Sequence, residues 1–413
     1  MAEAMALSPE MRAAVAQQAR AELVVGIPSY RNAATIGHVA RVAAEGLQKH
    51  FPGARAVIVN ADGGSNDGTS DRVRAEANGV PAIAGRYEGP SGKGSAFRAI
   101  FEAVGILGAR ACAVVDSDLR SITPEWIERL MGPVVRGEAE YVTPLYARHK
   151  YDGTITNTIA YPLTRALYGA RVRQPIGGEF GFHAKLARVF VDQPVWETDV
   201  ARFGIDIFMT TTALVRGAKV AQAFLGAKIH DPKDPGADLG PMFTQVVGTI
   251  LALARRNTDI WSGVKGSRDI PVIGEISVVE PEPVNASVPL LVEKFREGAA
   301  EQVRSWNEVF SAATRGYIAA KTAAAGHAKA VDGRVWAKAV YEVVAAAKDR
   351  DDTEGLARAL LPLYYGRVAA LIGEVEGLDQ AGAERVVEQQ ALVFEQTKPY
   401  LLERWSVGES SPR

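Results

Sequence analysis

The chain has 413 residues, of which 47% are hydrophobic and 23% are charged, as in folded globular proteins. This length exceeds the size at which one hydrophobic core usually stops growing, so we expect two packed units. The 47 Lys and Arg residues nearly cancel the 48 Asp and Glu residues, which excludes a global basic field that would attract nucleic acid or anionic lipid. No apolar run approaches the roughly 18 residues of a membrane span, and the single cysteine, Cys112, cannot form an intramolecular disulfide. These features predict a soluble, cytoplasmic protein.

The first part of the chain alternates short apolar runs with helical patterns. After a short amphipathic helix from about Ser8 to Ala21, strands are predicted over Glu22–Ile27, Ala56–Asn60, Pro81–Ala84 and Ala111–Val115. Helices are predicted between and after them, over Ala34–Lys49, Ser70–Asn78, Lys93–Leu107 and Pro124–Gly132. This order predicts an α/β fold with a mostly parallel sheet and helices on its faces. Ligands of such sheets bind beyond the carboxyl ends of the strands.

The later part of the chain is predicted to be helical. Prolines and acidic residues interrupt every regular pattern in 265–289, so this segment is predicted to be a linker between a first domain, 1–264, and a helical domain, 290–405. Apolar residues recur at spacings of three and four from Leu291 to Phe310, which indicates a helix. Further helices are predicted over Val335–Lys348, Glu354–Glu374 and Gly382–Trp405, followed by a disordered tail, 406–413. Exposed apolar residues of the helical part could seal a homodimer, but lid or packing roles are equally compatible.

The strongest local signal is Asp116-Ser117-Asp118, which directly follows a predicted core strand. Two carboxylates at the carboxyl end of a parallel strand can hold a hard divalent cation, Mg²⁺ or Mn²⁺, which would bridge the phosphate oxygens of a nucleotide. An aspartate that caps a helix would give the same pattern, and Asp-x-Asp alone does not decide between them.

Three further loops carry polar and glycine-rich sequences. Pro28-Ser29-Tyr30-Arg31-Asn32 follows the first strand, and the acidic Gly/Ser run Asp62–Thr69 follows the second, although its composition also suits a solvated turn. Ser91-Gly92-Lys93-Gly94-Ser95 precedes a helix, where glycines allow the backbone to approach an anion and Lys93 supplies a positive charge.

These loops together resemble the nucleotide-sugar-binding core of glycosyltransferases of the GT-A fold. The resemblance implies that the first two loops contact the base and ribose, and that Lys93 lies near the diphosphate. The residues expected to bind the nucleotide sugar are Pro28, Ser29, Tyr30, Asn32, Asp62, Lys93, Asp116, Ser117, Asp118, Gly177, Gly178 and Met242.

A narrower resemblance comes from Gln174–Glu179, from Gly204-Ile205-Asp206 and from His230, which are similar to motifs of the mannosylglycerate, glucosylglycerate and glucosyl-3-phosphoglycerate synthases. These are retaining GT-A enzymes. The resemblance implies that Asp118 and His230 ligate the metal beside Asp116. His230 follows a further predicted strand, Ala221–Ile229, and a lone histidine after a strand is normally a surface residue. It also implies that Asp206 orients the acceptor or stabilises charge and that Glu179 lies near the sugar, so Asp206, Glu179 and Lys93 are the expected catalytic residues. The alternative for Asp206 and Glu179 is a helix cap or a buried ion pair.

The acceptor loop is expected in Arg148–Asn157. Arg148, Asp152 and Thr156 match the glycerate-binding positions of the mannosylglycerate enzymes, and a guanidinium can clamp a carboxylate with two parallel hydrogen bonds. Thr154 is also expected to bind the acceptor, at the position where phosphoglycerate-using relatives carry an arginine that grips the phosphate. Its absence favours unphosphorylated glycerate, although His149 and Lys150 could substitute.

The expected function is therefore transfer of a hexose, with glucose favoured, from a UDP- or GDP-sugar to D-glycerate with retention of configuration. One alternative is a glucosyl- or mannosyl-3-phosphoglycerate synthase, and another is a GT-A transferase that acts on a lipid phosphate or a polysaccharide. A third is a non-catalytic nucleotide-sugar-binding protein. A nicotinamide dehydrogenase is disfavoured, because the first strand leads into Ile27–Gly37 with no GxGxxG.

Overall fold

The structure is a computed structural model that describes residues 5–18, 20–229, 239–277, 279–323 and 331–406. Its contacts divide the chain into two compact units, neither of which is continuous in sequence. Unit 1 comprises Met1–Ala147, Ile176–Asp231 and Ile270–Pro281, and unit 2 comprises Arg148–Pro175, Pro232–Asp269 and Glu282–Arg413.

Unit 1 is built on an eight-stranded sheet with the order β10-β8-β5-β7-β4-β1-β2-β3. Its strands are β1 (Leu23–Ser29), β2 (Ala56–Asp62), β3 (Ala82–Arg86), β4 (Ala111–Val114), β5 (Tyr141–Ala147), β7 (Phe180–His183), β8 (Val220–Ala227) and β10 (Val272–Ile273). Every neighbouring pair is parallel except those of β7, which runs antiparallel to β4 and β5. The carboxyl ends of the parallel strands and the amino end of β7 therefore meet at one edge of the sheet.

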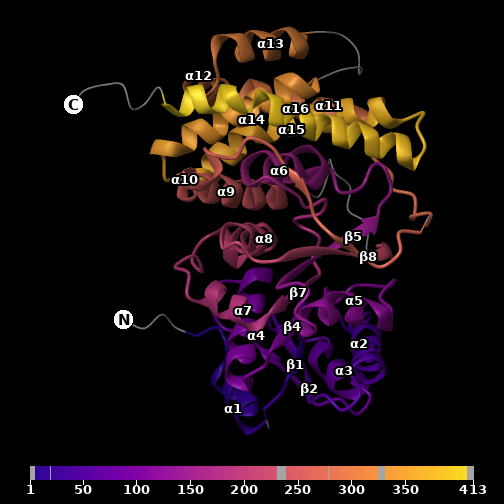
Figure 1. The fold of residues 1–413 in the computed structure, drawn as a ribbon. Helices are drawn as coiled ribbons and strands as arrows, with labels where there is room; N and C mark the ends of the chain where they lie inside the picture. Colours follow the sequence, from indigo (N-terminus) through magenta and orange to yellow (C-terminus); the bar gives the residue numbers. More distant parts are fainter. Residues whose placement is uncertain (1–4, 19, 230–238, 278, 324–330, 407–413) are drawn as a thin grey trace. The chain divides into compact units, whose positions relative to one another are not determined.

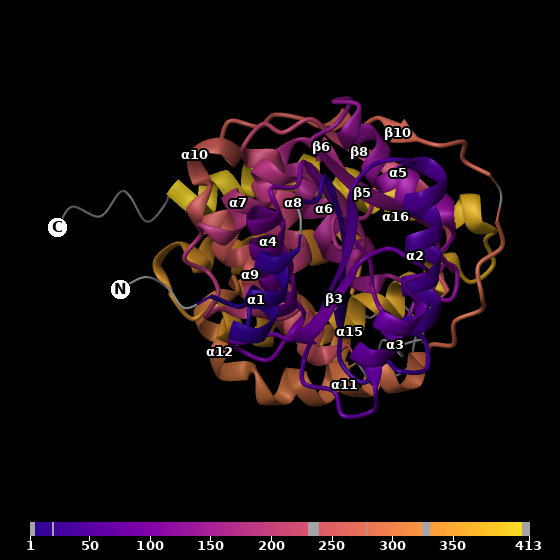
Figure 2. The ribbon, with the colours of Figure 1, turned by 90° about the horizontal axis from the view of Figure 1, so that it is seen from below.

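Helices cover both faces of this sheet, as Figures 1 and 2 show from two directions. On one face α4 packs against α1, α7 and α8, and on the other α2 packs against α3 and α5. The bounds are α1 (Pro9–Gln17), α2 (Ile36–His50), α3 (Thr69–Glu76), α4 (Lys93–Leu107), α5 (Pro124–Val135), α7 (Ala184–Val191), a 3-10 turn η2 (Asp199–Ala201) and α8 (Ile205–Val215). All seven residues of β1 are buried, because helices cover both of its faces.

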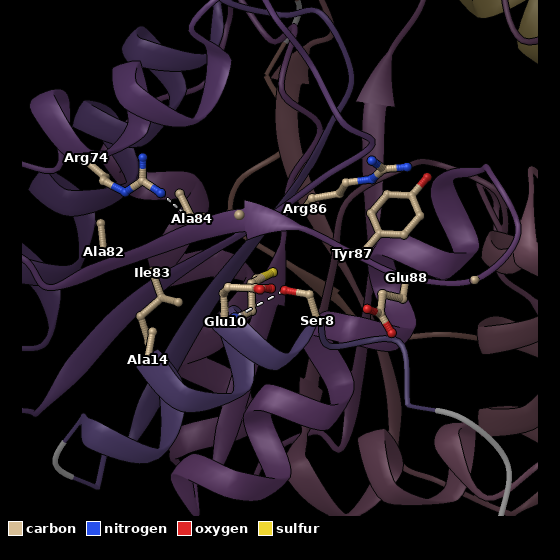
Figure 3. A pocket seen from close by; sticks show the side chains of 13 residues that line it. Ser8, Glu10, Ala14, Arg74, Ala82, Ile83, Ala84, Arg86, Tyr87 and Glu88 are labelled. Atoms are coloured by element: carbon tan, nitrogen blue, oxygen red, sulfur yellow. Dashed lines mark hydrogen bonds between the residues drawn. The ribbon is translucent and has the colours of Figure 1, made fainter.

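One edge strand of the sheet is β3, whose outer side borders a cavity of about 750 Å³. Figure 3 shows α1 beneath β3 and Arg74 of α3, which donates a hydrogen bond to the carbonyl oxygen of Ala84. The segment before α1 covers the end of this edge, since Leu7 pairs with Tyr87 in an isolated antiparallel bridge. No residue assigned from the sequence to the donor, the acceptor or the metal lines this cavity.

The described part of unit 2 is helical apart from a two-stranded sheet of β6 (Ala170–Arg171) and β9 (Arg268–Asp269). In this unit α15 packs against α11 and α9, while α16 packs against α14 and α6. Its helices are the π-helical turn η1 (Thr156–Ala160), α6 (Tyr161–Tyr168), α9 (Gly240–Arg256), α10 (Thr258–Trp261), α11 (Val288–Glu301), α12 (Val303–Val309), α13 (Ala312–Ala323), α14 (Gly333–Ala346), the 3-10 turn η3 (Ala347–Asp349), α15 (Thr353–Val375) and α16 (Gln380–Ser406).

The predicted fold class is confirmed, with a mostly parallel sheet between helices and a helical C-terminal region. The two units differ from the predicted division at residues 264 and 265, because α6 and α9 bury their apolar faces against helices of the C-terminal region. The segment 265–289, expected to be a linker, supplies β9 and β10, which pair with β6 and β8. The apolar pattern from Leu291 to Phe310 lies on two helices, since α11 ends at Glu301 and α12 begins at Val303.

The remaining sequence predictions concern the membrane and the chain end. Within the described residues, no helix is long and apolar enough to cross a membrane. Helix α16 ends at Ser406, and the rest of the predicted disordered tail, 407–413, lies outside the described residues.

Candidate active site

The loops after β1 and β2 form one hydrogen-bonded network around the buried carboxylate of Asp62. Its Oδ1 accepts from the backbone N–H groups of Gly64 at 2.8 Å and Ser65 at 2.6 Å. Its Oδ2 accepts from the hydroxyl groups of Ser29 at 2.7 Å and Ser65 at 2.8 Å, and Ser29 is also bonded to Asn60. Because its two oxygens together bind Ser29 at the end of β1 and the loop after β2, Asp62 fixes the shape of this region.

The loop after β1 is also tied to the loop after β4. The side-chain oxygen of Asn32 accepts hydrogen bonds from the hydroxyl of Ser117 at 2.8 Å and from the backbone of Tyr30 at 3.2 Å. Thr35 donates to the carbonyl oxygen of Ser117 at 2.9 Å. The Tyr30 side chain, which directly follows Pro28 and Ser29 at the end of β1, is 55% exposed. The network therefore holds an exposed aromatic ring where the carboxyl ends of β4, β1 and β2 meet.

Three of the predicted catalytic and donor-binding residues meet in a buried cluster. Asp116 comes two residues after β4, Lys93 is the first residue of α4, and Asp206 lies in the first turn of α8. The ammonium of Lys93 is 2.8 Å from Oδ1 of Asp116 and 3.4 Å from Oδ1 of Asp206. The positive end of the α4 dipole adds to the positive charge of Lys93.

A second lysine, Lys228, holds the other side of this cluster. It follows β8 directly, and its ammonium is 3.2 Å from Oδ2 of Asp116 and 3.0 and 2.9 Å from the two oxygens of Glu179. It also donates to the carbonyl oxygen of Gly177 at 2.9 Å. Glu179 has no exposed surface and accepts a further hydrogen bond, of 2.5 Å, from the hydroxyl of Tyr146 in β5. Two ammonium groups thus face three carboxylates at one edge of the sheet.

In this cluster, burial and ion pairing shift the pKa values of the charged groups in opposite directions. Burial raises the pKa of Glu179 to about 7, although Lys228 lowers it. Burial also raises the pKa of Asp206, against the effect of Lys93. Burial would raise the pKa of Asp116 as well, but Lys93 and Lys228 hold it well below its usual range. For Lys93 burial would lower the pKa, but Asp116, Asp206 and Glu179 raise it above its usual range, so this lysine stays charged at neutral pH.

Two glycines permit the close packing of the cluster. Gly178 has a φ of +98°, and a Cβ at this position would collide with the carboxylate of Asp116. At Gly94 a Cβ would collide with the carbonyl oxygen of Val200, against which the start of α4 packs. The glycine after Lys93, which the sequence suggested would allow the backbone to approach an anion, is thus required by packing within the protein.

Replacing Gly94 with alanine is expected to lower the free energy of unfolding by about 1–3 kcal/mol, because the added methyl group meets rigid backbone. The matched control is Gly105→Ala in the same helix, where a Cβ has nothing within 4 Å. That change should instead stabilise the protein by roughly 0.5–1 kcal/mol through helix propensity. Urea unfolding of both variants tests this, and equal effects at the two positions would contradict the packing described for Gly94.

The predicted acceptor residues lie in unit 2. Arg148 forms an ion pair with Asp152 at 2.9 Å and a hydrogen bond of 3.4 Å with Gln174. Thr156 begins the π-helical turn η1. Thr154 is 1% exposed, and its hydroxyl is 2.7 Å from the hydroxyl of Tyr364 in α15. The loop therefore brings a guanidinium, a carboxylate and hydroxyl groups together in one short segment.

The residues expected to hold the metal are described only in part. Asp118 is half-buried two residues after Asp116, whereas His230 lies outside the described residues. The described part of the chain contains no group of three or more His, Cys, Asp or Glu side chains placed to hold an ion. Both oxygens of Asp116 contact lysines, so the charge of this carboxylate is already neutralised. Carboxylate oxygen is the ligand type that Mg²⁺ and Mn²⁺ prefer. The donor chemistry of Asp118 fits a hard divalent cation.

Two other residues complete the comparison with the sequence prediction. Met242 is half-buried in the first turn of α9, in unit 2. Lys228 and Tyr146 were not predicted to be site residues, although they contact Glu179. Lys228 was assigned to the interior of a strand over Ala221–Ile229, whereas β8 ends at Ala227. A lysine at the carboxyl end of a strand, two residues before a predicted metal ligand, is the signal that could have identified it.

Comparison with known proteins gives relatives over part of the chain. No family model matches. Glucosyl-3-phosphoglycerate synthase from Mycolicibacterium paratuberculosis is 25% identical over 264 residues, covering 57% of this chain and 74% of that protein. The enzyme of the same name from Mycobacterium tuberculosis is 24% identical, covering 57% of this chain and 75% of that protein.

Solved structures of the Mycobacterium tuberculosis enzyme are also similar. Its complex with Mn²⁺, UDP and glucosyl-3-phosphoglycerate is 26% identical, covers 59% of this chain and 82% of that chain, and has a TM-score of 0.46. Its complex with Mg²⁺ and UDP is 25% identical over the same shares, also with a TM-score of 0.46.

The sheet, the loops at its carboxyl edge and these relatives define the class: the protein is a glycosyltransferase of the GT-A fold. Within that class its relatives are the glucosyl-3-phosphoglycerate synthases. The resemblance drawn from the sequence is confirmed at this level.

Proposed function

We propose that the protein transfers a glucosyl group from a nucleoside diphosphate glucose to D-glycerate, with retention of anomeric configuration and with Mg²⁺ or Mn²⁺ as cofactor. The observation that carries this proposal is the buried cluster of Lys93, Asp116, Glu179, Asp206 and Lys228 at the carboxyl edge of the sheet. The names of the relatives support a glucosyl transfer to a glycerate-type acceptor.

The donor is assigned to the loops after β1, β2 and β4. The exposed ring of Tyr30 suits stacking on the planar base, since every base offers a π-face. Asp62, Ser29 and Asn32 hold the loops in shape, and Pro28, Ser117, Gly177 and Gly178 are assigned to the same donor site. Because these groups do not distinguish uracil from guanine, both UDP-glucose and GDP-glucose are candidate donors.

The chemistry requires stabilisation of a departing diphosphate. In the proposed transfer the bond between the anomeric carbon and the diphosphate oxygen breaks, and the acceptor oxygen bonds to the same face of the sugar. The acceptor's hydroxyl proton passes to the leaving diphosphate, so no separate base is needed. Lys93, at the positive end of α4, is placed to stabilise the developing negative charge. A divalent cation held by Asp118 and His230, beside Asp116, would supply further charge neutralisation.

Asp206 and Glu179 are assigned to the sugar and the acceptor. Oδ1 of Asp206 is buried and accepts no hydrogen bond from the described residues, its contact with Lys93 being an ion pair at 3.4 Å. That oxygen can accept a hydrogen bond from an acceptor hydroxyl or stabilise positive charge on the sugar. Arg148 is assigned to the carboxylate of the acceptor, with Asp152 and Thr156 binding its hydroxyl groups.

The test is an assay of nucleoside diphosphate release with purified protein, UDP- or GDP-glucose, and either D-glycerate or 3-phospho-D-glycerate. Mannose donors serve as the comparison for the sugar. We expect release that depends on the acceptor, is fastest with glycerate, and disappears when EDTA removes the cation. If the protein prefers 3-phosphoglycerate, the proposed acceptor is wrong, whereas the assignment as a transferase stands. Binding of the sugar nucleotide without turnover of any pair would favour a non-catalytic binding protein.

A further inference from the structure

The acceptor loop, Arg148–Asn157, is held by the long helices of the C-terminal region. At its centre, the hydroxyl of Thr154 is 2.7 Å from the hydroxyl of Tyr364 in α15. Both side chains are buried, with Thr154 1% exposed and Tyr364 fully enclosed. If one of these buried hydroxyl groups is removed, the other is left without a hydrogen-bond partner, which is costly. The pair therefore constrains the loop strongly.

Tyr364 is itself fixed in position. Its ring stacks on Phe243 of α9, with 4.3 Å between the ring centroids and 29° between the planes. Phe243 is buried as well. Because the ring is stacked and enclosed, the hydroxyl of Tyr364 presents a rigid hydrogen-bonding point to Thr154.

The start of the acceptor loop is attached to the junction between α15 and α16. Lys150 donates hydrogen bonds to the carbonyl oxygens of Glu376 and Leu378, the latter at 3.0 Å. The side-chain amide of Gln380, the first residue of α16, donates to the carbonyl oxygen of Arg148 at 2.6 Å. The charge of Lys150 therefore lies at the carboxyl end of a helix, where the helix dipole favours a cation.

We propose that the C-terminal helices position the acceptor loop, and that Tyr364 is a positioning residue for acceptor binding. This inference rests on the proposed function, because it assumes that Arg148, Asp152 and Thr156 bind the acceptor. Tyr364 acts through Thr154 and fixes the loop at its centre, while Lys150 and Gln380 fix its start. Thr154 and Lys150 both make hydrogen bonds to the helices, so neither side chain is placed to grip a phosphate of the acceptor.

The first test is Tyr364→Phe, which removes only the hydroxyl and keeps the stacked ring. The KM for glycerate should rise about 3- to 10-fold, the effect of one lost hydrogen bond, while the KM for the donor stays unchanged. Thr154→Val should have the same effect, the double variant should be no worse than either single one, and Thr154→Ser should retain normal binding. The control is Tyr341→Phe, which loses a buried hydrogen bond of 2.7 Å to the carbonyl oxygen of Phe394 in the same helical region.

The second test measures backbone hydrogen exchange in the acceptor loop, which needs no enzymatic activity. Exchange of the amides around Thr154 should be faster in Tyr364→Phe than in the wild type, and unchanged in Tyr341→Phe. If Tyr364→Phe exchanges faster but the protein transfers no sugar, the contact between Tyr364 and the loop is supported and only the proposed function is overturned. An unchanged glycerate KM in an active Tyr364→Phe variant, or additive effects of Tyr364→Phe and Thr154→Val, would overturn the positioning role.

Discussion

Replacing Lys93 with methionine is expected to lower kcat for glycosyl transfer by about 10²- to 10³-fold, the typical effect of removing one group that stabilises developing negative charge. Methionine retains the length of the side chain and its packing beside Phe97, whose ring centroid is 5.2 Å from the ammonium. If Lys93 acts on the departing diphosphate, the loss falls on kcat, whereas a lysine that only binds the donor would affect the KM. Steady-state kinetics with varied donor separates the two effects.

The control for Lys93→Met is Lys49→Met, which removes an exposed lysine paired with Glu125 at 2.5 Å. Its activity should match that of the wild type, because exposed ion pairs contribute little. Thermal unfolding of both variants shows whether the folded state persists. A folded Lys93→Met protein with a wild-type kcat would contradict the assignment of Lys93 to the leaving group.

Replacing Lys228 with methionine is expected to cost about 3–5 kcal/mol in the free energy of unfolding, because it leaves buried carboxylates without their cation. Glu179 has no exposed surface, and Lys228 contacts both of its oxygens. The hydroxyl of Tyr146 remains as a donor to Glu179 but carries no charge. Urea unfolding measures the change.

The double variant Lys228→Met/Glu179→Gln should regain a large part of this loss, since removal of both charges leaves no uncompensated ion on Glu179. Lys219→Met, at an exposed position just before β8, serves as the control and should change stability by less than about 0.5 kcal/mol. If the double variant were no more stable than Lys228→Met, the cluster would owe its stability to something other than this ion pair.

Much of unit 1 could be predicted from local sequence patterns. Helix α4 has the predicted bounds, Lys93–Leu107, and β1 to β4 lie within two residues of the predicted strands. These elements are apolar runs bounded by turn residues, so the signal lies within each element. The rule that ligand sites form at the carboxyl edge of a parallel sheet predicts a site at Asp116. Lys93 is identified by its glycine-rich loop and Asp206 by the resemblance to known enzymes, and the structure brings the three together.

Other features depend on contacts between distant segments and have weak local signals. The antiparallel strand β7 has only four residues and is defined by its neighbours β4 and β5. Helices α6 and α9 fall within residues 1–264, which the sequence predicts to be the first domain. Their apolar faces nevertheless pack on α16 and α15, respectively. The contact between Thr154 and Tyr364 joins residues 210 positions apart, which no spacing in the sequence reveals.

The most direct test of the proposed function is the NMR spectrum of the product formed from nucleoside diphosphate glucose, D-glycerate and Mg²⁺ or Mn²⁺. An α-linked glucoside of glycerate, formed only when acceptor and cation are both present, is the predicted result. A β-linked product, or free glucose released at the same rate with and without glycerate, would contradict retaining transfer to this acceptor.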